Sequence, residues 1–297
     1  MKKLKNLWPR GTKIKKMKNN KKIIVLYHKS CTDGFGAAWV AWRKLGRHAE
    51  YIAVKHDDPY PEIVKGRDTY LLDISYDFKK TKKLIKDVKS LTIIDHHIST
   101  EKSTKLAGNY LYALDHSGSA LAWQYFHPNK KTPTLVKYIE DIDIWNMAMR
   151  NTRELLASLE TYDHDFVLWN KIAKDWERGD SQKKYLVEGK AILKYKDYLI
   201  EKAVKDGDEV TLLGKRALVV NNNLSLNSEI GDAIRKKGYP LGIIWQQKND
   251  KLVVSLRSTA KVDSSKIAAR FGGGGHKKAS AFRLPAKIKF PWKRIKK

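Results

Sequence analysis

Residues 91–97, Leu91-Thr92-Ile93-Ile94-Asp95-His96-His97, are the stretch of the chain that decides its fold. Their uncharged first four residues predict a short buried strand, and an acid with two imidazoles follows it directly. Such a triplet at the end of a buried strand is poorly suited to packing and well suited to binding a metal. The stretch therefore indicates an α/β core with a metal site at one edge.

The segments around this stretch alternate between apolar runs and amphipathic helices. Strands are predicted at residues 22–27, 51–54, 69–74 and 91–94, and helices at 35–45, 78–89, 117–126 and 134–141. This alternation predicts a parallel sheet with helices on both faces. Ligands bind beyond the carboxyl ends of such strands, where His28, Asp73 and Asp95 are expected.

The pattern changes along the second half of the chain. Residues 150–205 read as wholly helical, and a smaller α+β domain with two hairpins and two helices is expected from residue 206. The predicted organisation is a basic tail (1–21), a metal-binding α/β domain (22–150), a helical connector (151–205), an α+β domain (206–286) and a second basic tail (287–297).

Composition limits the class of protein. Of the 297 residues, 42% are hydrophobic, which is enough for two folded domains. Cys31 is the single cysteine, so an internal disulfide is excluded, and no apolar run approaches the roughly 18 residues of a membrane span. No signal-peptide pattern is seen at the basic N-terminus. These features predict a cytoplasmic protein without a membrane segment.

The formal net charge of +28 is extreme. One interpretation is a basic surface that attracts nucleic acid, and the other is a general drift toward lysine in an AT-rich genome. Lysines are spread along the whole chain, with concentrations only at its two ends, so composition leaves both interpretations open.

A second signature lies far downstream. Gly272, Gly273, Gly274 and Gly275 precede His276, and a predicted helix leads into this run. Glycines let backbone amides approach an anion without interference from side chains. Arg257, at the end of a predicted strand, can form a bidentate clamp on a phosphate. Together with the metal-binding triplet, these residues predict an enzyme that uses metal ions on a phosphate ester.

The order of these motifs resembles the DHH superfamily of phosphoesterases, over roughly residues 22–285. The quoted pieces are His28 with Thr32-Asp33-Gly34, then Asp73, Asp95-His96-His97 and Asp141-Ile142-Asp143, and the run 272–276 is similar to the signature of a DHHA-type domain. Within the superfamily the likeness is greatest to the oligoribonuclease and nanoRNase branch. The resemblance implies a parallel-sheet DHH domain followed by a smaller substrate-binding domain.

The resemblance also implies a role for each residue. His28 and Asp33 would bind one ion, Asp73 would bridge, and His96 with Asp141 or Asp143 would bind the other. Asp141 is favoured, because the residues next to Asp143 read as packing residues. Further roles are proposed near the phosphate: Asp95 as a metal ligand or as support for His96, His97 as the group that neutralises or protonates, and Arg257, Gly273, Gly274, Gly275 and His276 as binders of substrate phosphate.

Cys31 departs from the family pattern, which usually has an aspartate there. The family implies two Mn²⁺ ions first and Mg²⁺ second, whereas a thiolate ligand would favour Zn²⁺. Three interpretations follow: Cys31 binds a metal, it only lines the site, or it marks reduced activity.

The function predicted from the sequence is a hydrolase of phosphoric ester bonds. It would cleave phosphodiester bonds of short single-stranded oligonucleotides with a metal-activated water, as an exonuclease or oligoribonuclease does. The alternatives are a nucleoside 3′,5′-bisphosphate phosphatase, a cyclic-dinucleotide phosphodiesterase, and a nucleic-acid-binding protein that has lost catalysis. An oligomer is compatible with all of these.

Overall fold

The computed structural model describes residues 22–29, 31–224 and 226–295. The chain divides into two compact units between Gly189 and Lys190. The first predicted basic tail, residues 1–21, lies outside the described residues, as does the end of the second.

The first unit is built on a five-stranded parallel sheet with the order β2-β1-β3-β4-β5. Its strands are β1 (Ile23–His28), β2 (Ala49–Val54), β3 (Asp68–Leu72), β4 (Ser90–Asp95) and β5 (Asn109–Tyr112). The predicted parallel α/β fold is confirmed. The edge strand β5 was not predicted, because its four residues are only partly buried or exposed and form no continuous apolar run.

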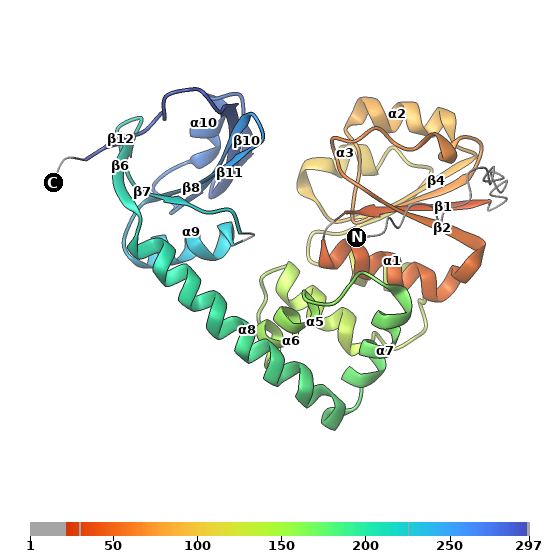
Figure 1. The fold of residues 1–297 in the computed structure, drawn as a ribbon. Helices are drawn as coiled ribbons and strands as arrows, with labels where there is room; N and C mark the ends of the chain where they lie inside the picture. Colours follow the sequence, from red (N-terminus) through yellow and green to blue (C-terminus); the bar gives the residue numbers. More distant parts are fainter. Residues whose placement is uncertain (1–21, 30, 225, 296–297) are drawn as a thin grey trace, which may run out of the picture. The chain divides into compact units, whose positions relative to one another are not determined.

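Helices cover both faces of this sheet (Figure 1). Around it lie α1 (Thr32–Leu45), η1 (Gly46–His48), η2 (Glu62–Val64), α2 (Phe78–Asp87), η3 (Ile98–Thr100), α3 (Glu101–Thr104), α4 (Gly118–Phe126), α5 (Thr134–Asp143), α6 (Thr152–Leu159) and α7 (Phe166–Trp176). Alternate strand residues point to opposite faces, so Val25 joins the core under α1 and α4, and Ile24 joins the core under α2. Each core holds large, fully buried side chains, such as Trp39 and Leu84.

The expected connector, residues 151–205, is not a separate segment. Leu155 of α6 and Trp169 of α7 are fully buried in the same core as α1, so both helices complete the first unit. The helix α8 (Gly179–Lys205) contributes Tyr185 to that core and Ile200 to a core of the second unit. The sequence alone suggested a connector because helical periodicity does not reveal what an apolar face packs against.

The second unit is a seven-stranded mixed sheet with the order β10-β11-β9-β8-β7-β6-β12. Its elements are β6 (Asp208–Leu212), β7 (Lys215–Asn221), α9 (Asn227–Lys236), β8 (Leu241–Lys248), β9 (Lys251–Ser258), α10 (Ser264–Ala269), β10 (Gly274–His276), β11 (Ala279–Pro285) and β12 (Lys293–Arg294). Only β7 and β8 pair in parallel, with α9 as the crossover between them. The two predicted hairpins are β6–β7 and β8–β9.

The prediction of a basic tail at residues 287–297 needs correction for its described part. Strand β12 pairs with β6, and the rings of Phe290 and Trp292 lie 4.9 and 6.4 Å from that of Trp245. Two aromatic side chains among the lysines thus anchor this segment on the sheet, and the density of positive charge concealed that signal in the sequence.

Candidate metal centre

Histidines and carboxylates converge where the strands of the first unit end. His28 is the last residue of β1, and Asp73 follows β3 directly. His28 Nδ1 lies 3.4 Å from Asp73 Oδ2, and His96 Nε2 lies 3.3 Å from Asp73 Oδ1. Asp143, the last residue of α5, brings Oδ2 to 3.4 Å from His96 Nε2. Residues that span more than a hundred positions therefore form one cluster, as expected at this edge of a parallel sheet.

Three groups of side chains in the described chain have ligand atoms within 4.8 Å of one another. They are His28, Cys31 and Asp73; Asp73, His96 and His97; and Asp33, His96 and Asp143. Asp73 and His96 each belong to two groups, which is what adjacent metal positions with shared ligands require. The resemblance had paired Asp33 with His28, whereas here Asp33 groups with His96 and Asp143.

Asp73 lies at the centre of the cluster, and its buried carboxylate lacks hydrogen-bond partners in the described part of the chain. Its side chain is 1% exposed, and neither carboxylate oxygen has a hydrogen-bond partner among the described residues. His28 Nδ1 and Asp143 Oδ2 are also buried atoms without a hydrogen-bond partner among the described residues. Buried polar atoms without partners cost free energy unless another group satisfies them. The oxygen and imidazole ligands present here fit divalent cations.

The backbone of Asp73 is also unusual, because its φ of 55° lies in the left-handed region. Residues other than glycine adopt that region at some cost, and such strain persists where the surrounding fold enforces it. Burial tends to raise the pKa of Asp73, but His28, His96 and His97 hold that pKa well below its ordinary value. The carboxylate is thus kept ionised in the interior.

Asp33 is held in place by the N-terminus of α4. Its two oxygens accept hydrogen bonds from the amides of Gly118, at 2.6 Å, and Ser119, at 2.9 Å. The positive end of the helix offsets part of the charge. Burial, and then the charges of Asp73 and Asp143, still raise the pKa of Asp33 well above its ordinary value. A cation bound between Asp33 and Asp143 would favour the ionised form of both carboxylates.

Asp95 supports His97 and His96 and lies outside the three groups. It is fully buried, and its Oδ1 accepts hydrogen bonds from His96 N at 2.8 Å and lies 2.7 Å from His97 Nδ1. Its Oδ2 accepts a hydrogen bond from Thr100 Oγ1 at 2.8 Å. Of the two roles predicted for Asp95, this geometry favours orientation of the histidines, the usual role of a carboxylate behind a metal-binding imidazole.

The contacts of Asp141 and Asp143 are the reverse of those that the sequence favoured. Asp141 is buried and accepts hydrogen bonds from Ala148 N, Met149 N and Thr152 Oγ1. It therefore fixes the turn after α5. Asp143 is the acid that reaches His96. Burial and the charge of Asp73 raise the pKa of Asp143, as expected for an acid beside other acids.

Because Asp143 lies in the cluster and Asp141 holds a turn, replacing the first should reduce metal binding and replacing the second should reduce stability. Asp143→Ala is expected to lower metal content and leave the free energy of unfolding of the metal-free protein within about 1 kcal/mol of wild type. Asp141→Ala should lower that free energy by about 2–4 kcal/mol, because buried amides and a hydroxyl lose their acceptor. Urea unfolding in the presence of a chelator and metal analysis of the purified variants measure both. The assignment is wrong if Asp141→Ala alone depletes the metal.

Cys31 and His56 complete the surroundings of His28. Cys31 immediately precedes α1, and its Sγ belongs to the group with His28 and Asp73. Burial and the neighbouring carboxylates raise the pKa of the Cys31 thiol. The ring of His56 lies 5.0 Å from that of His28 and 5.8 Å from that of His97. Its position just after β2, at the same edge of the sheet, was the sequence signal for it.

The predicted phosphate-binding residues lie together in one part of the second unit. Arg257 is the penultimate residue of β9 and donates to Ser228 Oγ at 3.2 Å, and its stem packs where a side chain at Gly231 would be. In β10, Gly274 pairs with Ala281 and His276 with Ala279. A side chain at Gly273 would collide with the carbonyl of Ala281, so this glycine is required by packing. Gly274, Gly275 and His276 are exposed.

Comparisons with known proteins address the fold of the chain. Residues 220–292 match the model of the DHHA1 domain family. An uncharacterized protein, R106, of Acanthamoeba polyphaga mimivirus is 27% identical over 283 residues, which are 86% of this chain and 66% of that protein. The chain thus spans slightly less than two thirds of this relative.

Two solved structures share the fold over most of the chain. A pGpG-specific phosphodiesterase, PggH from Vibrio cholerae, has a TM-score of 0.53 at 12% identity and covers 90% of this chain and 94% of its own. The exonuclease RecJ bound to manganese has a TM-score of 0.52 at 14% identity, covering 89% and 86%. The chain has the DHH fold with a DHHA1 domain. This confirms the fold predicted from the motifs.

The helices of the described chain include no segment that meets the length and hydropathy needed to cross a membrane.

Proposed function

We propose that this DHH protein hydrolyses phosphodiester bonds of short single-stranded oligonucleotides, with dinucleotides among its substrates. The observation that carries the proposal is the buried cluster around Asp73, whose unpartnered oxygens and imidazole nitrogens fit divalent cations. Ions bound there would polarise the phosphate and lower the pKa of a water molecule. The similarity to a phosphodiesterase named for pGpG and to an exonuclease supports this substrate class.

Metal binding and contact with the phosphate would fall to different side chains. Asp73, His96, Asp33 and Asp143 would hold the cations, with His28 beside them. His97 is 34% exposed while its Nδ1 is fixed by Asp95, so it can meet a phosphate without losing its orientation. Burial tends to lower the pKa of His97, but Asp95 raises it above its ordinary value, which favours a proton on the ring. His97 would therefore neutralise or protonate near the scissile phosphate.

The second unit would bind the substrate phosphate. Arg257 is the cation there, and exposed Gly274, Gly275 and His276 supply backbone groups that a phosphate can approach. Fixed charge and positioning, rather than covalent chemistry by the protein, would supply most of the rate enhancement.

The test is a substrate panel assayed with Mn²⁺, Mg²⁺ and Zn²⁺ in turn. It contains labelled dinucleotides, longer single strands, cyclic dinucleotides and a nucleoside 3′,5′-bisphosphate. We expect the highest kcat/KM on the dinucleotides or short strands with Mn²⁺. Faster turnover of the bisphosphate or of a cyclic dinucleotide would replace the proposed substrate, and binding without turnover of any substrate would contradict the proposed activity.

The metal identity is tested at Cys31. A thiolate is a softer ligand than a carboxylate, so the position shared with His28 and Asp73 should prefer thiophilic ions. Cys31→Asp is expected to shift the ratio of bound zinc to manganese toward manganese by at least about tenfold and to maintain or raise Mn²⁺-dependent turnover. Metal analysis after dialysis against equimolar ions measures the ratio. Cys31→Ser is the control of similar size, and an unchanged ratio in both variants would show that Cys31 only lines the site.

A further inference from the structure

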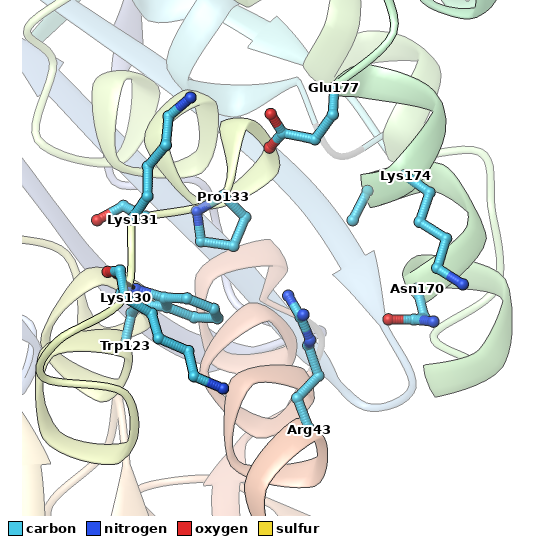
Figure 2. A pocket seen from close by; sticks show the side chains of 10 residues that line it. Arg43, Trp123, Lys130, Lys131, Pro133, Asn170, Lys174 and Glu177 are labelled. Carbon is cyan, nitrogen blue, oxygen red and sulfur yellow. Dashed lines mark hydrogen bonds between the residues drawn. The ribbon is translucent and has the colours of Figure 1, made fainter.

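A hollow of the first unit, separate from the metal centre, has four cationic side chains among the residues that line it. Its volume is about 290 Å³, and it is formed by α1, α4, α7 and the loop between α4 and α5. Figure 2 shows the guanidinium of Arg43 near the middle, with Lys130 and Lys131 on the loop side and Lys174 on the α7 side. We call it the basic pocket.

The charges of the basic pocket are unbalanced. Glu177 is its single acidic residue, and Glu177 Oε1 already accepts a hydrogen bond from the amide of Thr134 at 2.7 Å. Lys130, Lys131 and Lys174 form no ion pair with any described residue. Four cations around one hollow repel one another, so an anion that enters it relieves that repulsion.

The one aromatic ring that lines the pocket is already covered by its neighbours. Trp123 is only 4% exposed, and its Nε1 donates to the carbonyl of Lys130 at 3.0 Å. The Arg43 guanidinium lies 5.2 Å from the centre of the Trp123 ring and the His127 ring 4.3 Å from it, so these neighbours flank the ring. A base therefore finds no open aromatic face, and the side-chain donors that line the pocket are those of the cations, Thr132 and Asn170.

The pocket lies away from the metal centre within the same unit. Asp33 is in the first turn of α1 and Arg43 in its last, ten residues further on. At 1.5 Å per residue this is about 15 Å along the helix. At the ~3.4 Å rise of a stacked strand, this length corresponds to four or five nucleotides, more than a stacked dinucleotide spans.

We propose that the basic pocket binds the phosphodiester backbone of a single nucleic-acid strand, independently of base sequence. Exposed lysines hold one small anion weakly because water screens them, whereas a strand engages several at once and releases condensed counterions. The inference does not depend on the proposed hydrolysis. It goes beyond that function because a dinucleotide at the metal centre is too short to reach the pocket.

The test compares two triple variants that remove the same number of charges. Lys130→Gln/Lys131→Gln/Lys174→Gln changes the pocket. Lys79→Gln/Lys83→Gln/Lys86→Gln, on exposed positions of α2 against the other face of the sheet, is the matched control. Fluorescence anisotropy with a labelled 20-nucleotide strand, in a chelator and across a salt series, reports binding without cleavage.

The pocket variant is expected to bind the strand roughly tenfold more weakly than wild type. Its slope of log K against log salt should be smaller by about two, because three contacts are lost at ~0.7 each for a single strand. An equal loss in the α2 control would overturn the proposal, since net charge would then explain it. Pyrophosphate that binds wild type as tightly as the strand would also overturn it, in favour of a small-anion site.

The rate of dinucleotide hydrolysis by the pocket variant distinguishes failure of this inference from failure of the proposed function. If dinucleotides are cleaved, the pocket variant should cleave them at the wild-type rate, and a parallel fall in that rate would contradict a separate site. If no substrate is cleaved, the proposed function fails, and the anisotropy experiment still decides the pocket.

Discussion

Asp73→Asn is expected to abolish hydrolysis, with kcat/KM lower by about 10³-fold or more, or roughly 4 kcal/mol of transition-state stabilisation. Asp73 belongs to two of the three ligand groups, so its loss should deplete more than one cation. Asparagine is the right substitute because, like aspartate, it tolerates the left-handed backbone found at this position. The change therefore removes charge while the turn after β3 can persist.

Kinetics with a dinucleotide and metal analysis of the same preparation measure this effect. Circular dichroism should show an unchanged fold. Asp180→Asn is the matched control, since Asp180 is 95% exposed on α8 and should keep full activity and metal content. An Asp73→Asn protein with wild-type turnover would remove Asp73 from the centre of the site, and the metal-bridging interpretation with it.

Gly118→Ala should disturb the metal centre although Gly118 is not itself one of the proposed metal ligands. A Cβ at Gly118 would lie 2.6 Å from Asp73 Cβ and 2.9 Å from Asp33 Oδ2, closer than real contacts allow. The start of α4 must then move away, which weakens the hydrogen bonds that hold Asp33. Overpacking of this kind costs about 1–3 kcal/mol of stability. We expect activity to fall by about 10²-fold, because ligands displaced by even 1 Å lose their geometry.

Gly108→Ala is the matched control, because a Cβ at Gly108 meets no atom within 4 Å. It should leave both turnover and the thermal midpoint near wild type, whereas Gly118→Ala should lower both. Comparison of metal affinity in the two variants tests the mechanism directly. Equal metal affinity and equal turnover in both proteins would show that α4 does not position the carboxylates.

The sequence predicted most of the side chains that cluster at the edge of the sheet, because the carboxyl ends of parallel strands meet there. His28, Asp73 and His96 could each be predicted, since each ends or closely follows an apolar run that reads as a strand. His56, two residues after β2, obeys the same rule, although its acidic neighbours and Pro59 are typical of a loop. The rule identifies the edge of the sheet at which a site forms, but it does not tell which side chains at that edge contact one another.

The choice between Asp141 and Asp143 shows where sequence reasoning ends. Two residues apart on a helix, their side chains point about 200° apart, so only one can face the metal centre. The irregular turn after α5 decides which, because Ala148 and Met149 present their amides to Asp141. In that turn Trp145 and Met147 adopt positive φ, which no pattern of apolar residues predicts.

The sequence by itself determined the parallel sheet, the DHHA-type second domain and the donor types at the metal centre. Hydrophobic periodicity and strand ends are local properties, and a chain displays them without folding. Only the tertiary structure decided that Asp143 joins His96, that α6 and α7 complete the first core, and that Arg43 and Lys174 share a pocket. These outcomes depend on which distant surfaces pack together, and that packing fixes where each side chain points.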